Sequence, residues 1–192
     1  MSNIPSIPLS AAYVLLGLIR HEPLHGYEIH RRLAETPELR LVWHIKQSRL
    51  YALLSRLEDE GLAGVKVEPQ EARPPRKVYH LTATGRHAYE QWLTQPVDLP
   101  RELRLDFMLK LYFAIEEGPE TLSLLIQRQQ EICAHWLATW GGGNASTPGG
   151  GDAPVSPFIH AVRCYRHSHI EAIQEWLTSL SDDRVPVDEG VL

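Results

Sequence analysis

Three cationic side chains gather around two prolines in the stretch EARPPRKVYHLT, which spans residues 71–82. The three are Arg73, Arg76 and Lys77. Guanidinium and ammonium groups bind phosphate oxygens, and Pro74-Pro75 stiffens the backbone, so that less entropy is lost on binding. The stretch predicts a rigid, anion-binding tip, although an ordinary solvated turn would explain these residues if they stood alone.

A second group of residues that suit chemistry lies near the end of the chain, at helical spacing. It consists of His160, Cys164, His167 and Glu171. Imidazole, thiolate and carboxylate groups bind transition metals, and this spacing places all four on one helix face. One straight helix rarely offers more than two or three ligands to one ion, so we favour a polar outer face or subunit contacts. We expect no metal and no other cofactor, and keep a metal site at His160, Cys164 and His167 as the alternative.

Motifs for catalysis are missing from the sequence. It contains no glycine-rich phosphate loop, no HExxH motif and no serine or cysteine nucleophile elbow. The paired acidic residues Glu116-Glu117 and Asp182-Asp183 are neighbours in sequence, so each pair diverges from its helix or tail. We therefore expect that the protein is not an enzyme.

The composition is that of an ordinary globular chain with an uneven charge. Of 192 residues, 43% are hydrophobic and 22% charged, and the formal net charge is -5. The absence of a long apolar run and of a signal peptide, together with two distant cysteines, favours a reducing cytoplasm. Residues 1–95 hold 12 Lys and Arg against 10 Asp and Glu, whereas residues 96–192 hold 7 against 14. This asymmetry suggests that the first half meets an anion.

Apolar spacing predicts the elements that must position the cationic tip. We expect a buried helix at 10–21, a turn at EPLHG, and a short helix over GYEIHRRLAE in which Tyr27, Ile29 and Leu33 pack. LVWHI, residues 41–45, has the composition of a short strand. Two strand-like runs flank the cationic tip, and Thr82 caps the helix that follows them.

Between these elements, the segment KQSRLYALLSRLEDEGL has four leucines on one helix face and ends at Gly61. The leucines are Leu50, Leu53, Leu54 and Leu57. The order helix, helix, strand, helix, strand, strand, helix is that of a winged helix-turn-helix, in which the third helix enters the DNA major groove and the hairpin is the wing. The order therefore predicts a DNA-binding unit with the cationic tip on its wing.

The outward face of this third helix is suited to a groove. Its ridge consists of Ser48, Ala52, Ser55 and Asp59, mostly small residues. Basic residues at its start and acidic residues at its end oppose the helix dipole, which favours an anion at the amino end over mere solvated charges. The expected DNA contacts are Lys46, Gln47, Ser48, Arg49, Tyr51, Ser55, Arg56, Arg73, Arg76 and Lys77.

The second half of the chain reads as helices at about 101–117, 119–140 and 157–180. The middle helix carries a heptad-like seam for a partner helix, although plain core explains it equally well. The expected dimerisation residues on the last two helices are Leu122, Ile126, Gln129, Cys133, Trp136, Trp140, Val162, Tyr165, Ile173 and Trp176. We thus expect a DNA-binding domain at 1–95, a linker at 96–100, a dimerisation region at 101–180 with a mobile loop at 141–157, and a tail at 181–192.

The chain resembles the PadR family of bacterial transcriptional regulators. The resemblance rests on YVLLGLIRHEPLHGYEIHRRL, SRLYALLSRLEDEGL and PRKVYHLTATGR, and more loosely on EWL near Trp176. It implies a winged-helix dimer that binds a two-fold operator, usually as a repressor, with the helices behind the wing domain forming the dimer. It also implies DNA contacts from the helix that holds Leu50-Tyr51 and from the wing.

This chain departs from the family pattern at two places, and the resemblance also implies a class of ligand. Ser48-Arg49 stands where many relatives have glycine, and the glycine-rich insert at 141–157 is atypical. Some relatives bind small, often aromatic, inducers near the dimer interface. We therefore expect a mainly α, cytoplasmic, homodimeric DNA-binding regulator with a small α/β wing and helices at its C-terminal end; the alternatives are a winged-helix protein-interaction module and a metal-responsive regulator.

Overall fold

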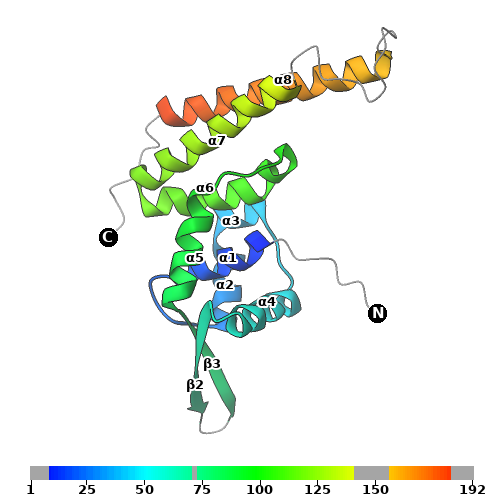
Figure 1. Ribbon diagram of the computed structural model, residues 1–192. Helices are drawn as coiled ribbons and strands as arrows, with labels where there is room; N and C mark the ends of the chain where they lie inside the picture. Colours follow the sequence, from blue (N-terminus) through cyan, green and yellow to red (C-terminus); the bar gives the residue numbers. More distant parts are fainter. Residues whose placement is uncertain (1–8, 71–72, 141–155, 183–192) are drawn as a thin grey trace.

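A hairpin-bearing helical unit carries a second layer of helices at the end opposite its hairpin (Figure 1). The computed structural model describes residues 9–70, 73–140 and 156–182. The first unit consists of α1 (Leu9–Leu18), β1 (Leu24–His25), α2 (Gly26–Glu35), α3 (Pro37–Val42), α4 (Gln47–Asp59), β2 (Ala63–Gln70), β3 (Arg73–Leu81) and α5 (Ala83–Thr94). The second consists of the 3-10 helix η1 (Pro100–Arg104), α6 (Asp106–Glu117), α7 (Pro119–Trp140) and α8 (Pro157–Asp182). The predicted loop at 141–157 and tail at 181–192 fall largely outside the described residues.

Helix α4 is stabilised by the burial of four leucines on one of its faces. Leu50, Leu53, Leu54 and Leu57 are each 0% exposed, as their spacing predicted. Gly61, at a φ of 69°, ends the helix: its N–H donates to Glu58 O over 3.0 Å, and that of Leu62 to Leu57 O over 2.9 Å. This pair of bonds satisfies the last carbonyls and turns the chain into β2.

The wing is the long arm of a three-stranded antiparallel sheet in the order β1-β3-β2. Val65 and Leu24 both pair with Tyr79, one from each side. A bulge between Glu68 and Gln70 loosens the pairing toward the tip. Thr82 then caps α5 by accepting from Gly85 N over 2.9 Å, as predicted.

Two local predictions in this unit are wrong. The EPLHG segment supplies β1 instead of only a turn, and the predicted strand at 41–45 is instead the end of α3 followed by a short connection to α4. Pro37 at the first turn favours the helix, which carries Leu41 and Val42 along with it. The second edge of β3 pairs with Leu24 and His25, more than fifty residues earlier in the chain, a long-range contact that local composition does not encode.

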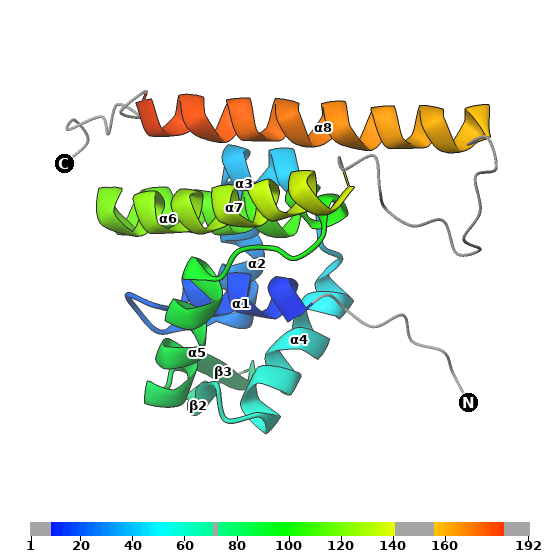
Figure 2. The same cartoon turned by 45° about the horizontal axis from the view of Figure 1, so that its top comes forward.

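The second layer packs onto the first through α6 and part of α7, and α7 and α8 run alongside one another (Figures 1 and 2). The core is continuous across both layers and includes Phe107 and Phe113 of α6, each 0% exposed. Among the described residues, no helix is long and apolar enough to span a lipid bilayer.

The heptad-like seam of α7 faces its own chain. Ile126, Gln129, Cys133 and Trp136 are buried, and Leu122 is partly so. The Gln129 amide exchanges hydrogen bonds with the backbone N and O of Val97, at 2.8 and 3.2 Å. The Trp136 indole donates to Asp98 O over 3.2 Å. Within this chain the seam thus packs against the segment after α5 and neighbouring helices, which fits plain core, while its part in a dimer stays a prediction. The Trp140 side chain lies outside the described structure.

Helix α8 is unevenly covered. In its second half Ile170 and Leu177 are buried, Ile173 is half-buried, and Trp176 meets Phe107 edge to face at 5.9 Å. Its first half is largely exposed. There Val162 is half-buried, whereas Phe158, Ile159 and Tyr165 are exposed. Of the predicted dimerisation residues on α8, Tyr165 and Val162 therefore lie on the more open part, and Ile173 and Trp176 pack within the chain.

Candidate nucleic-acid interface

The amino-terminal turn of α4 presents two basic side chains and free backbone N–H groups to solvent. Lys46, which precedes the helix, and Arg49 in its first turn are both exposed. Lys46 makes no side-chain cap hydrogen bond. The first N–H groups of a helix have no partner within it, and the helix dipole is positive there, so this turn attracts an anion.

The outward ridge of α4 is open along its length. Ser48, Ala52, Ser55 and Asp59 are all exposed, as are Gln47 and Tyr51. The helix wheel is therefore confirmed: leucines point inward and small residues outward. A helix with small outward residues can lie close to a groove floor, where hydroxyl groups reach base edges or phosphates.

Two tyrosines and the wing surround a hollow beside this ridge. Tyr27 is 65% exposed and Tyr51 is 40% exposed. Both line a hollow of about 600 Å³, to which Arg76 and Lys77 of the wing also contribute. The Tyr51 ring lies directly against Gly26 at the start of α2. The arrangement combines hydroxyl donors, flat rings and cations on one face, which suits a phosphate backbone.

Tyr27 was placed wrongly by the sequence pattern. Ile29 and Leu33 are buried as predicted, whereas Tyr27 points to solvent. The signal was present in the spacing, because Ile29 and Leu33 are four residues apart and Tyr27 lies out of phase with them. An exposed tyrosine beside the cationic wing belongs with the candidate contacts.

Two of the expected contacts are already paired with carboxylates. The Lys77 ammonium donates to Glu58 of α4 over 2.8 Å, and this hydrogen bond raises the pKa of Lys77. Arg56 lies 2.6 Å from Glu60, one turn further along α4. The first of these pairs fastens the wing to the carboxyl end of α4, so the two elements present one surface. Arg76 is exposed, and the Arg73 side chain lies outside the described part of the chain.

The candidate metal ligands do not converge. The Cys164 thiol lies 3.5 Å from His160 Nε2, and His167 Nε2 lies 3.3 Å from Glu171, each one turn apart on α8. Within residues 9–70, 73–140 and 156–182 there is no group of three such residues that could hold a metal ion. The spacing thus yields two separate pairs, which fits a polar helix face.

Helix α2, helix α4 and the β2–β3 hairpin together define a winged helix-turn-helix protein. Residues 15–91 match the model of the transcriptional regulator PadR-like family. The matched residues, which are similar to that family, include α2, α4 and the wing.

Individual relatives extend this comparison. The negative transcriptional regulator PadR of Bacillus subtilis (strain 168) is 36% identical over 101 residues, which are 53% of this chain and 54% of the relative, so the match spans about half of each. The crystal structure of Bacillus subtilis PadR in complex with operator DNA is 28% identical, covers 89% of this chain and 97% of that one, and has a TM-score of 0.44. The complex of the same protein with p-coumaric acid is 25% identical, covers 90% and 97%, and has a TM-score of 0.40.

Proposed function

We propose that this protein represses transcription by binding a two-fold operator as a homodimer. The observation that carries the proposal is the open face on which the amino end of α4, the exposed tyrosines and the wing lie together. It is an anion-binding helix end next to a small-residue ridge and a cationic hairpin, the parts that backbone contact and groove reading require. Repression is inferred from the name of the Bacillus subtilis relative, a negative regulator.

The test is fluorescence anisotropy of purified protein with its own promoter region and with scrambled DNA, over a salt series. We expect selective binding to the promoter that weakens steeply with salt, because Lys and Arg contacts to phosphates release counterions. Weak and equal binding to both DNAs would overturn the proposal. It would favour the alternative of a winged helix that binds a protein partner.

The homodimer would form through the first half of α8. Phe158 and Tyr165 are 76% and 68% exposed there, and exposed apolar groups on one helix stretch mark an interaction surface. A second copy of the chain fits this surface because a two-fold dimer would place two α4 helices on one face of DNA, about 34–36 Å apart.

A small aromatic effector is the release signal that we infer. A cavity of about 450 Å³ lies between α1 and α5 on one side and η1 and α6 on the other, and its walls include Tyr13, Trp92 and Lys110. The Tyr13 and Trp92 rings stack at 5.5 Å, and the Lys110 ammonium lies 5.5 Å from the Trp92 ring. Titration with p-coumaric acid as the probe, followed by tryptophan fluorescence and by operator release, tests this. Quenching without release would leave an occupied cavity that does not regulate.

A further inference from the structure

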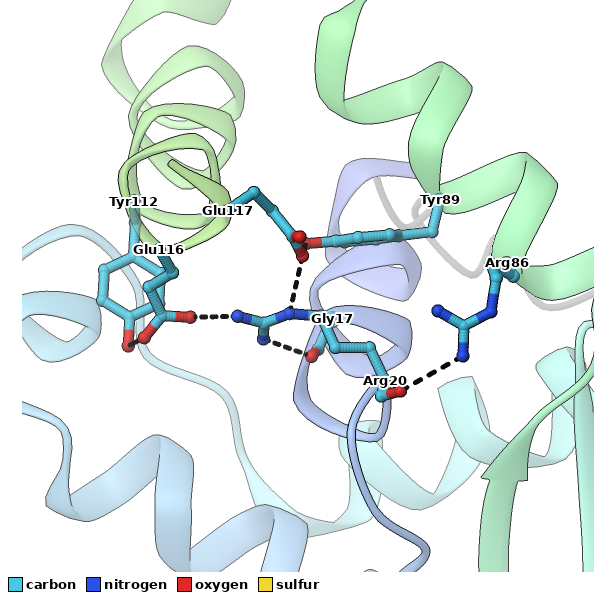
Figure 3. A network of polar contacts seen from close by, with 7 residues as sticks. All are labelled: Gly17, Arg20, Arg86, Tyr89, Tyr112, Glu116 and Glu117. Atoms are coloured by element: carbon cyan, nitrogen blue, oxygen red, sulfur yellow. Dashed lines mark hydrogen bonds and ion pairs between the residues drawn. The ribbon is translucent and has the colours of Figure 1, made fainter. Parts of the chain in front are cut away.

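An arginine buried between the two layers makes directed polar contacts to both (Figure 3). Arg20 lies just after α1, and its partners Glu116 and Glu117 are the last two residues of α6. Arg20 Nη2 is 2.7 Å from Glu116 Oε2, and Arg20 Nε is 2.7 Å from Glu117 Oε1. Arg20 Nη1 donates to Gly17 O over 2.6 Å, which holds the guanidinium against the end of α1. One planar group thus joins the DNA-facing unit to the helical layer.

Each carboxylate is itself held in place by a tyrosine. The Tyr112 hydroxyl donates to Glu116 over 2.7 Å, from within α6. The Tyr89 hydroxyl donates to Glu117 over 3.3 Å, from α5. Arg86 of α5 adds a hydrogen bond to Arg20 O over 3.3 Å. The network therefore ties three helices together at one corner, as Figure 3 shows.

The surroundings of Arg20 restrict its freedom further. Its side chain is only 9% exposed, and its guanidinium lies 5.4 Å from the Phe113 ring centre. The same ring comes so close to Gly17 that a Cβ there would lie 2.7 Å from it. Helices α1 and α6 consequently touch at van der Waals distance beside the ion pairs, and a small rotation of α6 would break the contacts.

Apolar contacts and ion pairs contribute differently to the junction between the two layers. Burial of apolar surface holds the layers together but has no preferred direction. Guanidinium–carboxylate contacts depend on direction, and a buried pair adds little net stability because desolvation offsets the attraction. The network is therefore better suited to setting the angle of α6 than to holding the fold together.

The orientation of α6 affects the orientation of α7 and α8. Helix α7 begins at Pro119, one residue after the turn at Gly118, and α8 packs along α7 (Figure 1). In the proposed dimer the second subunit is attached through α8. A change of angle at Arg20 would thus be amplified into a change in the distance between the two copies of α4.

We propose that Arg20, acting through Glu116 and Glu117, is a positioning residue that sets the half-site spacing which the dimer accepts on DNA. This inference rests on the proposed function, because it needs two DNA-reading helices held by one dimer. Arg20 itself lies away from the open face and touches no candidate DNA contact, so its effect would appear in spacing preference and not in phosphate contacts.

The first experiment compares operators whose half-sites are moved apart or together by about two base pairs, using a two-fold sequence selected by the wild-type protein. We expect the wild type to lose about tenfold in affinity on altered spacings, and Arg20→Met to reduce that discrimination to about threefold or less. The affinity of Arg20→Met for a single half-site, and the salt dependence of that affinity, should equal those of the wild type. Arg20→Lys should restore part of the discrimination, and Arg31→Met, which removes an exposed pair within α2, should leave it intact.

A second experiment needs no DNA, so it tests the role of Arg20 separately from the proposed DNA-binding function. Spin labels at Ser55→Cys on α4 and Glu175→Cys on α8, in a Cys164→Ser background and diluted into unlabelled protein, report the angle between the layers. Arg20→Met, or the milder Glu116→Gln if the first variant does not fold, should broaden or shift this distance distribution. An unchanged distribution with unchanged spacing discrimination would overturn the inference. Failure of the wild type to bind DNA selectively would instead overturn the proposed function.

Discussion

At the amino end of α4, Arg49 is the cation that we propose as a base contact. It is exposed, one turn into the helix, and beside the small residues Ser48 and Ala52. A planar guanidinium at such a place can form two hydrogen bonds to one base, whereas Lys46 provides a mobile point charge. The two cations therefore differ in the part that we assign to them.

Arg49→Ala is expected to weaken operator binding by about tenfold, and to weaken binding to random DNA much less, because a base contact is lost. Anisotropy titrations with both DNAs measure the difference. Lys46→Ala serves as the comparison, since loss of a phosphate contact should affect both DNAs alike. Equal losses for Arg49→Ala would make it a phosphate contact as well.

Lys110 is a charge in the interior, at 4% exposure, with its ammonium donating to Gln95 O over 2.6 Å. Burial lowers its pKa from 10.5 to about 8, although Asp106, Asp98 and Glu102 act in the opposite direction. Between these two values the unfolded chain holds the proton and the folded chain releases it. Stability from this group therefore rises with pH across that window, and the cost of burying the charge is fully present below it.

The expected gain from pH 8 to above 10.5 is on the order of 3 kcal/mol of unfolding free energy for this one group. Urea unfolding of the wild type and of Lys110→Met, measured in parallel at each pH, gives the contribution of Lys110 as the difference between the two unfolding free energies. The variant corrects for other groups, such as Cys133, whose pKa burial raises to about 11 and whose contribution falls as the pH rises through 9 to 11. Parallel pH curves for the two proteins would contradict the assignment.

At the scale of elements, the wing and α4 present one surface, because Lys77 of the wing forms an ion pair with Glu58 of α4. The hairpin register brings Arg76 opposite Glu68, near the bulge, and leaves it exposed. In the proposed DNA complex, this exposed cation would follow a phosphate backbone beside the groove that α4 would enter.

Arg76→Ala should weaken binding to all DNA sequences and lower the salt slope by about one, because one phosphate contact and its counterion are lost. The salt series of the anisotropy titration gives the slope. Arg31→Ala, which removes a charge from α2, provides the control. A wild-type slope in Arg76→Ala would mean that the wing tip does not touch DNA.

Glu58→Gln should act in the opposite direction. With the carboxylate neutralised, Lys77 is freed from its partner and becomes available to phosphate, so affinity for random DNA and the salt slope should both increase, the slope by about one. Glu90→Gln on α5 removes the same charge elsewhere and corrects for the overall change in net charge. An identical gain in both variants would show that Lys77 stays out of reach of DNA.

At the scale of the whole molecule, the open half of α8 and the candidate nucleic-acid interface lie in different layers (Figure 2). We therefore expect mutations to affect the proposed homodimer and the proposed DNA binding separately. Phe158 is the most exposed of the large apolar residues on α8, at 76%.

Phe158→Asp is expected to weaken the homodimer by about tenfold or more, since a charge would be buried in an apolar contact. Light scattering during size exclusion gives the mass over a dilution series. Ser168→Asp, also exposed on α8, is the control. If Phe158→Asp leaves the mass unchanged, the dimer is formed by another surface or is absent.

Several features of the first unit follow from local sequence alone. The leucine spacing of α4, the cap at Thr82 and the stop at Gly61 were predicted and are confirmed, because each depends on residues within about one or two helical turns. The small outward ridge follows from the same spacing. Tyr27 is the exception, because its aromatic ring predicts burial, whereas its position two residues before Ile29 places it on the exposed face of the helix.

Other features depend on contacts between distant segments. Strand β1 forms because Leu24 meets Tyr79, far along the chain, and the seam of α7 makes hydrogen bonds to Val97 and Asp98 of its own chain. Periodicity identifies a face that must be buried but not the surface that buries it. The junction at Arg20 and Glu116 is of the same kind.

The sequence by itself determined the class of this protein: the order of its helices, the apolar and outward faces of α4, and the cationic wing all follow from local propensity and spacing. Only the tertiary structure decided which cations are free and which are paired, that two tyrosines share the open face, and that one arginine joins the two layers. The physical reason is distance along the chain. Local rules act within a few residues, whereas ion pairs and packing between layers join residues nearly a hundred positions apart, as Arg20 and Glu116 do.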